Sequence, residues 1–272
     1  MKRYHTVLTI AGSDTGGGAG IQADIKTASA CGCYVASVIT ALTAQNTQGV
    51  DGIHTVPASF VRMQAEAVLS DIGADAVKLG MLPTAEIVET VAEVLEKHAV
   101  RNVVLDPVMI ATSGDRLISK EAAEAILNRL LPLARVVTPN LPEAEFMTGI
   151  RLLPENPKDS FREMAARLFD KGADGVLLKA GHLEGAEVCD LLFDGRPEKQ
   201  YDYPYRKTLT PNTHGTGCTL SSAIASFLAL GFALPEAVGK AEEYIHDAIR
   251  AGADYKIGHG HGGVHHFFKY WD

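Results

Sequence analysis

Cysteine is scarce in this chain, and its spacing suits neither a metal site nor a disulfide framework. Only four cysteines occur among 272 residues: Cys31, Cys33, Cys189 and Cys218. None of them forms a C-x-x-C pair, which argues against a zinc site, and a chain of this length does not depend on disulfides for stability. We therefore expect a reducing, cytoplasmic setting, with Cys31, Cys33 and Cys189 as packing residues.

Long hydrophobic runs and an excess of positive charge are also absent. No stretch reaches the roughly 20 apolar residues that span a bilayer, and the apolar run near the N-terminus is too short for a signal peptide. The net charge of -8 disfavours nucleic acid as a partner, because phosphate backbones attract basic surfaces. We expect no membrane and no nucleic-acid partner, although small anions need only a local cluster of donors.

No Pro- or Ser-rich linker, long charge run or internal repeat divides the sequence. Apolar runs near residues 77, 103, 135 and 176 have the continuous pattern of buried parallel strands and alternate with helical patterns. The segments 186–195 and 199–205 are typical of an antiparallel pair. We predict one domain, residues 1–272, with an α/β fold: a mostly parallel central sheet with helices on both faces.

Polar or pocket-forming residues follow one expected strand after another. In order along the chain they are Gln45 and Asn46, Met81, Asp106, Asn140 and Glu143, and Lys179. Ligands of open α/β sheets bind at the carboxyl ends of the strands, so we expect these residues at one edge of the sheet. Asp24, about one turn into the helix that follows the first strand, is a further candidate for that edge; its alternative is a surface or capping residue.

Two carboxylates and a lysine in this set suggest phosphate chemistry. Asp106 and Glu143 are candidate ligands of Mg²⁺, which favours one or two carboxylates together with substrate phosphates; the alternative is that they cap helices or turns. Lys179 is placed to neutralise phosphate charge; the alternative is a lysine whose stem is buried at the edge of the core.

The segment Gly215-Thr216-Gly217-Cys218 opens a helix of small and apolar residues. Backbone N–H groups at a helix N-terminus attract anions, and the glycines leave those groups accessible. The same position should lower the pKa of the Cys218 thiol and favour the thiolate. The alternative is that Cys218 is a small core residue.

Two glycine-rich segments are less specific. Residues 12–20 match neither a Walker A loop nor a clean G-x-G-x-x-G motif, and are either a flexible turn or a loop that approaches a ligand closely. Residues 258–263 match G-x-G-x-x-G, but no strand precedes them and no helix follows. We expect a glycine-rich extension packed by aromatic residues rather than a metal site, although it carries four histidines: His259, His261, His265 and His266.

Taken together, these motifs resemble a known family. The sequence is similar to the hydroxymethylpyrimidine/phosphomethylpyrimidine kinases of the ribokinase-like superfamily. The resemblance is carried, in order from Ala11 to Ala225, by AGSDTGGGAGIQADIKT, TALTAQNTQGV, VKLGML, LDPVMIATSGDRL, TPNLPEAE, LKAGH and NTHGTGCTLSSAIA. One departure is Ala180, where glycine is common in the family.

The resemblance implies a kinase that uses ATP and Mg²⁺. Such enzymes phosphorylate 4-amino-5-hydroxymethyl-2-methylpyrimidine and then its monophosphate, and a homodimer is expected. By the same likeness, Cys218 would accept the hydroxyl proton and Gln45 would bind the aminopyrimidine edge. The other implied roles are a pocket of Gly12, Asp24, Met81 and Val108, metal ligation by Asp106 and Glu143, phosphate contacts by Asn140, Lys179 and Thr216, and an anion hole at Gly215, Thr216 and Gly217.

Three rival functions follow from the same residues. A pyridoxal or pyridoxine kinase of the same superfamily would also phosphorylate a hydroxymethyl group. A non-catalytic pyrimidine-binding module would need none of Asp106, Glu143, Lys179 and Cys218. An NAD-dependent dehydrogenase would need a fingerprint after the first strand, which is missing. The candidate lid of the site is the segment ATSGDRL, residues 111–117.

Overall fold

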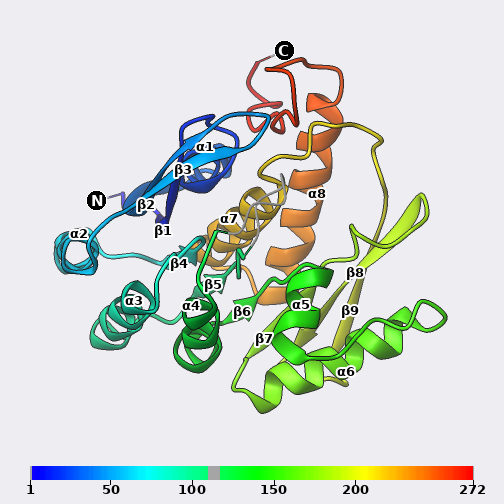
Figure 1. Cartoon of the computed structure of the whole chain (residues 1–272), viewed down its shortest axis with the longest axis horizontal. Helices are drawn as coiled ribbons and strands as arrows, with labels where there is room; N and C mark the ends of the chain where they lie inside the picture. Colours follow the sequence, from blue (N-terminus) through cyan, green and yellow to red (C-terminus); the bar gives the residue numbers. More distant parts are fainter. Residues whose placement is uncertain (1, 110–116, 272) are drawn as a thin grey trace.

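The structure is a computed structural model that describes residues 2–109 and 117–271. Its centre is a nine-stranded sheet with the strand order β3-β2-β1-β4-β5-β6-β7-β8-β9 (Figure 1). The strands are β1 (Thr6–Asp14), β2 (Tyr34–Gln45), β3 (Val50–Thr55), β4 (Ala76–Leu79), β5 (Val103–Leu105), β6 (Val136–Val137), β7 (Gly175–Leu178), β8 (Glu187–Asp194) and β9 (Gln200–Arg206). Six neighbouring strands are parallel: β2, β1, β4, β5, β6 and β7. The edge strands β3, β8 and β9 pair antiparallel with their neighbours.

Helices cover both faces of this sheet, as predicted (Figure 1). They are α1 (Gly20–Ala30), α2 (Ala58–Asp71), α3 (Ala85–Lys97), α4 (Lys120–Ala125), α5 (Leu141–Thr148), α6 (Pro157–Asp170), α7 (Thr216–Ala229) and α8 (Leu234–Gly252). α4 continues into a π-helical turn (Ile126–Leu130) and a 3₁₀ turn (Leu131–Leu133). α1, α7 and α8 pack on one core, and α2 to α6 pack on the other.

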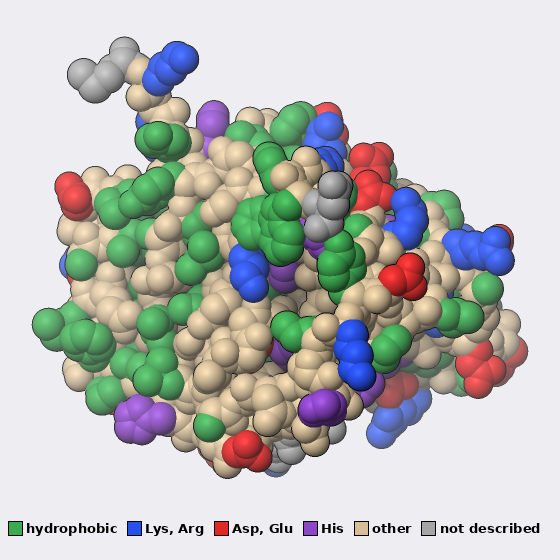
Figure 2. Space-filling view, turned by 90° about the horizontal axis from the view of Figure 1, so that it is seen from above, with side chains coloured by type: hydrophobic (Ala, Val, Ile, Leu, Met, Phe, Trp, Pro, Cys, Tyr) green, Lys and Arg blue, Asp and Glu red, His purple; other side chains and the backbone are tan. Residues whose placement is uncertain are grey.

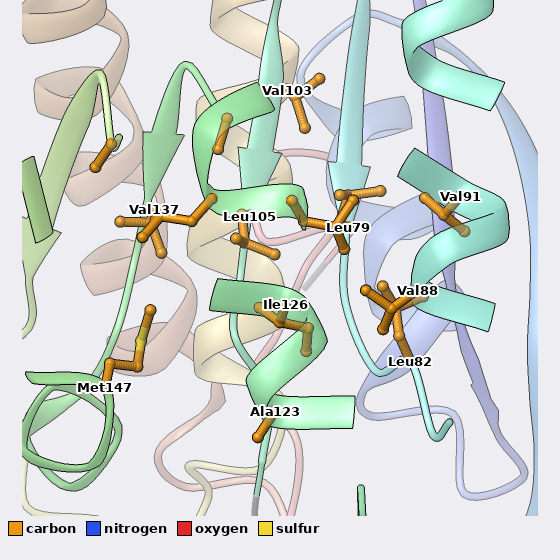
Figure 3. Close-up of a cluster of buried hydrophobic side chains, with 14 of the residues drawn as sticks. Leu79, Leu82, Val88, Val91, Val103, Leu105, Ala123, Ile126, Val137 and Met147 are labelled. Carbon is orange, nitrogen blue, oxygen red and sulfur yellow. The ribbon is translucent and has the colours of Figure 1, made fainter. Parts of the chain in front are cut away.

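The two cores follow from the alternation of side chains along each strand. Val103 and Leu105 belong to one core, and Val104 between them belongs to the other, because neighbouring strand residues point to opposite faces. Figure 3 shows Leu79, Leu105 and the helical Ile126 in the first core. Strands buried on both faces are apolar at almost every position, with exceptions such as Lys78 in β4, which explains the nearly continuous apolar runs in the sequence.

Two elements were absent from the sequence-based expectation. Strand β3 is exposed along almost its whole length, so it lacks the apolar pattern of the central strands. Helix α5 has only eight residues and begins directly after β6 with a capping box of Asn140 and Glu143. The expected antiparallel pair is confirmed as β8 and β9. The candidate lid, residues 111–117, lies outside the described residues except for Leu117.

Membrane insertion through a helix finds no support within residues 2–109 and 117–271. None of the helices in these ranges combines the length and the apolar character needed to cross a bilayer.

Candidate active site

A cavity of about 830 Å³ opens at the carboxyl ends of the parallel strands. It appears as the hollow near the centre of the face in Figure 2. Two of the predicted residues, Asp24 and Asn46, do not line it, whereas the others do: Gly12, Gln45, Met81, Asp106, Val108, Asn140, Glu143, Lys179, Gly215, Thr216, Gly217 and Cys218. The carboxyl ends of the parallel strands and the start of α7 therefore bring these residues to one cavity.

One end of the cavity is formed by β1, β2 and the residues after β4. A Cβ at Gly12 would lie 3.1 Å from the Met81 sulfur, so a larger residue would crowd this wall. Gln45 closes β2, and its Oε1 accepts a hydrogen bond of 3.1 Å from the Thr43 hydroxyl. A planar ring with hydrogen-bonding groups on its edge suits this combination of a flat wall and an amide.

The other end is the N-terminus of α7. Gly215 has φ +80°, and a Cβ there would lie 1.8 Å from the Gly18 carbonyl oxygen, so only glycine fits. A Cβ at Gly217 would lie 3.4 Å from Lys179 Nζ and 3.6 Å from Asp106 Oδ2. The first turn of α7 therefore lies close to the lysine and the carboxylate, and the N–H groups at a helix N-terminus and the macrodipole favour an anion there.

Lys179 and Asp106 form an ion pair at this end. Lys179 Nζ lies 3.3 Å from Asp106 Oδ1, and both side chains are largely buried. Burial works against the charge on Lys179, but the carboxylates of Asp106 and Glu143 raise its pKa. Lys179 is therefore a cation at neutral pH, held within the cavity wall.

Glu143 combines a structural role with an unusual charge environment. In the capping box, its carboxylate accepts from the Asn140 N–H at 2.8 Å, and Asn140 Oδ1 accepts from the Glu143 N–H at 2.9 Å. Burial, with repulsion from Asp106, raises the pKa of Glu143 to about 7 despite the opposing charge of Lys179. Two carboxylates that repel each other in a cavity fit a divalent cation. Among the described residues no cluster of three or more His, Cys, Asp or Glu completes a site, so phosphates and water would supply the remaining ligands.

The expectation for the Cys218 thiol is wrong in direction. Cys218 lines the cavity at the third residue of α7, but burial raises the pKa of its thiol to about 11, although the nearby charge of Lys78 opposes this. The negative charges of Asp24 and Asp106 raise this pKa further. The thiol is therefore protonated at neutral pH in the unliganded protein.

Asp24 is the predicted pocket residue that the structure places elsewhere. It is 1% exposed and lies beneath the cavity, 3.0 Å from Nζ of the fully buried Lys78. The hydroxyls of Thr9 and Ser222 also donate to it, at 2.6 and 2.7 Å. A buried lysine requires a counter-charge, so Asp24 faces inward and connects α1, β1, β4 and α7.

A carboxylate and a histidine missed by the sequence analysis join two loops of the site. Asp14 accepts hydrogen bonds from the N–H groups of Gly18 and Ala19 at 3.0 and 2.8 Å, and lies 2.8 Å from His214 Nε2. Burial opposes ionisation of Asp14, but these bonds lower its pKa. The glycine-rich loop after β1 is therefore tied to the residue before Gly215.

A second group that the sequence does not reveal lies beside the segment of Lys179 and Ala180. Asp190 on β8 and Glu242 on α8 both line the cavity and are almost fully buried. Burial, strengthened for Asp190 by repulsion from Glu242, raises the pKa of each to about 8. The pair therefore retains a proton at neutral pH, and a sequence offers no local signal for a contact between β8 and α8.

Ala180, the departure from the family pattern, does not enlarge the cavity wall. Its side chain is fully buried in the core, and its N–H donates to Asp190 Oδ1 at 2.6 Å. Lys179 and Gly181 on either side line the cavity. The additional methyl group therefore faces the interior, away from any ligand.

Comparison with known proteins agrees with this geometry. The chain is 51% identical over 264 residues to the hydroxymethylpyrimidine/phosphomethylpyrimidine kinase of Rhizobium meliloti, covering 97% of each chain. It is 52% identical to the thiamine biosynthesis bifunctional protein ThiED of Geobacter sulfurreducens, with 96% of this chain matching and only 52% of that longer protein covered.

Solved structures and a family model point the same way. The ADP complex of Bacillus subtilis pyridoxal kinase superposes with a TM-score of 0.89 at 34% identity, covering 99% of this chain and 100% of that chain. The family model described as phosphomethylpyrimidine kinase matches residues 14–265. The chain therefore belongs to the phosphomethylpyrimidine kinase family.

Proposed function

We propose that this kinase transfers the γ-phosphoryl group of ATP to 4-amino-5-hydroxymethyl-2-methylpyrimidine and then to its monophosphate, as one domain over residues 1–272. The observation that carries the proposal is the ion pair of Lys179 and Asp106 beside Gly217 at the start of α7, where an added Cβ would lie 3.4 and 3.6 Å from them, in a cavity whose other end is Gln45. Phosphoryl transfer needs chiefly positioning and charge stabilisation, which this arrangement supplies.

In the first step, the substrate hydroxyl oxygen bonds to the γ-phosphorus as the bond from that phosphorus to the bridging oxygen of ADP breaks. The hydroxyl proton passes to the thiolate form of Cys218, which is a minor species at neutral pH because burial raises the pKa of this thiol to about 11. Lys179 and the N–H groups of residues 215–217 neutralise charge on the phosphoryl oxygens. Asn140 and Thr216 complete the phosphate contacts.

Asp106 and Glu143 would hold the divalent cation. When bound, Mg²⁺ neutralises the phosphate oxygens and orients them for transfer. The raised pKa of Glu143, about 7, supports this assignment, because a nearby cation relieves the repulsion between the two carboxylates.

The second step differs in its acceptor. A phosphate monoester is already largely ionised at neutral pH, so its oxygen needs no base to become a nucleophile. The same anion-binding groups then serve both steps, whereas the proton acceptor serves only the first.

Substrate choice separates this proposal from a pyridoxal or pyridoxine kinase; pyridoxal kinase is the name of a structural neighbour. We expect the protein with ATP to yield both the mono- and the diphosphate of the pyrimidine alcohol, with a higher kcat/KM than for pyridoxine. Gln45→Ala should lower kcat/KM for the pyrimidine alcohol by about 10–100-fold, because it removes hydrogen bonds to the ring edge, and affect pyridoxine less. Products are followed by mass spectrometry and rates by ADP release.

Gln48→Ala is the matched control, since Gln48 is an exposed glutamine in the loop after Gln45 and does not line the cavity. A clear preference for pyridoxine would overturn the substrate assignment. Tight binding of the pyrimidine alcohol without consumption of ATP would favour a non-catalytic binding module.

We also propose a cytoplasmic homodimer that uses the N-terminal edge of the sheet. Hydrophobic side chains are exposed on β2, β3 and α2: Tyr34, Leu42, Ile53, Phe60 and Met63. Figure 2 shows hydrophobic side chains gathered on the left, over this part of the molecule. Such a patch suits a self-complementary interface. For the wild-type protein, sedimentation should give twice the chain mass of 29.0 kDa. Phe60→Glu should shift the measured mass toward that of the single chain. A wild-type monomer at micromolar concentration would contradict the dimer.

A further inference from the structure

The glycine segment, residues 258–263, binds the loop that follows β2. The N–H groups of His259 and Gly260 donate to the Thr47 hydroxyl at 3.2 and 3.1 Å, and the His261 N–H donates to the Thr47 carbonyl at 2.8 Å. Three successive N–H groups therefore meet one threonine. Figure 1 shows this C-terminal segment beside the loop that joins β2 and β3.

The same segment also binds the loop that precedes α7. The His214 N–H donates to the Gly262 carbonyl at 3.0 Å, and His214 forms a parallel bridge with Gly263. Asn212, buried in this loop, donates to the carbonyls of Gly252 and Tyr255 at 2.8 and 2.6 Å. The segment therefore bridges two loops that are far apart in the sequence.

Close approach explains why every second residue of this segment is glycine. A Cβ at Gly258 would lie 2.2 Å from the Thr47 hydroxyl oxygen. A Cβ at Gly260 would lie 2.0 Å from the Thr47 carbonyl oxygen. A Cβ at Gly262 would lie 2.2 Å from Asn212 Oδ1. These distances exclude any side chain without movement of the loops, so the pattern GHGHGG has a packing cause that needs neither a nucleotide nor a metal.

Both loops carry parts of the site. Thr47 lies two positions after Gln45, and His214 immediately precedes Gly215. His214 is further held by Asp14, so movement of either loop would be transmitted to the cavity wall. The glycine segment itself does not line the cavity, and its effect on the reaction must pass through these two loops.

We propose that the glycine segment is a positioning element that sets the distance between the acceptor end at Gln45 and the anion hole at residues 215–217. The proposal rests on the function proposed above. It assigns to Thr47, Gly260 and Gly262 a role in the reaction without contact to either substrate. The two sides of the segment act on different substrates, because Thr47 adjoins the acceptor end and Asn212 and His214 adjoin the phosphate end.

Two glycine variants test this division. Gly260→Ala displaces the Thr47 loop and should raise KM for the pyrimidine alcohol about 10-fold, with KM for ATP within about 2-fold of wild type. Gly262→Ala displaces the loop before α7 and should raise KM for ATP and lower kcat, each by about 10-fold, with a smaller effect on KM for the alcohol. Steady-state kinetics with each substrate varied in turn gives all four quantities.

Matched variants separate positioning from general damage to the fold. Gly239→Ala in α8 meets only an ordinary contact of 3.5 Å and should leave both KM values unchanged. Thr47→Val should reproduce the effect of Gly260→Ala, and Thr47→Ser, which retains the hydroxyl, should restore wild-type kinetics. Thermal unfolding of each variant shows how much folded protein is present.

Loss of fold alone lowers the apparent kcat of both glycine variants and leaves each KM unchanged; that result overturns the positioning role. Equal changes in both KM values for both variants also overturn the division between the two loops. Failure of the wild-type protein to phosphorylate the alcohol would instead contradict the proposed function, so the two failures are distinguishable.

Discussion

Lys179→Met is expected to lower kcat by about 10²–10³-fold, with KM for the pyrimidine alcohol within about 3-fold of wild type. Methionine retains the length and the apolar stem of the side chain but removes the charge. The ammonium group lies 3.3 Å from Asp106 and faces Gly217 at the start of α7, where phosphoryl oxygens would bind. Its loss therefore affects the transferred group and not the acceptor ring.

Removal of Lys179 also leaves the neighbouring carboxylates without their cation, so the folded state must be monitored. Thermal unfolding reports the loss of stability. Lys158→Met is the control, since Lys158 is an exposed lysine paired with Asp202. If kcat of a folded Lys179→Met protein remains within a few-fold of wild type, Lys179 does not stabilise the transferred phosphoryl group.

Cys218→Ala is expected to slow the first phosphorylation by about 10²-fold or more and the second by less than about 3-fold. The alcohol must lose a proton, whereas the monophosphate is already ionised. The two steps are measured separately, with the alcohol or its monophosphate as the only acceptor. Equal slowing of both steps would mean that Cys218 serves packing or binding and not proton transfer.

The pH dependence sharpens this test. Because the pKa of the Cys218 thiol is raised from 9.0 to about 11, the thiolate fraction grows tenfold per pH unit between pH 7 and 10. A thiolate base therefore requires the first step to accelerate over this range in the wild type, and the acceleration should disappear in Cys218→Ala. Cys31→Ala, which removes a free thiol outside the cavity, should retain it.

The central fold follows from local patterns because each buried strand is apolar on its own. β4, β5 and β7 are short apolar runs, and their carboxyl ends correctly located Met81, Asp106 and Lys179 at one cavity. The exposed edge strand β3 escaped notice because Asp51, Gly52 and His54 give it no buried face. Position in the sheet, not the sequence of β3 itself, determines that it pairs.

The misjudged site residues depend on partners that are remote in the sequence. Its position one turn into α1 predicts Asp24 at the ligand edge, but the fold shows that Lys78, within an apolar run, is buried and has Asp24 as its counter-charge. The thiol of Cys218 was expected to be acidic from its helix position, but burial decides its pKa. Burial and long-range charge are properties of the assembled site.

The hydrogen bonds that join loops far apart in the sequence also have a consequence for the rate of folding. Gly260 and Thr47 are 213 positions apart, and His214 and Asp14 are 200 apart. Closing such long loops costs chain entropy before any contact offsets it, and non-local contacts slow folding. The core around α2, α3 and α4 joins residues that are much nearer in sequence, so it can form first. We therefore expect that a chain with an intact central sheet can still lack the proposed anion hole, and that competence for catalysis is one of the last properties acquired during folding.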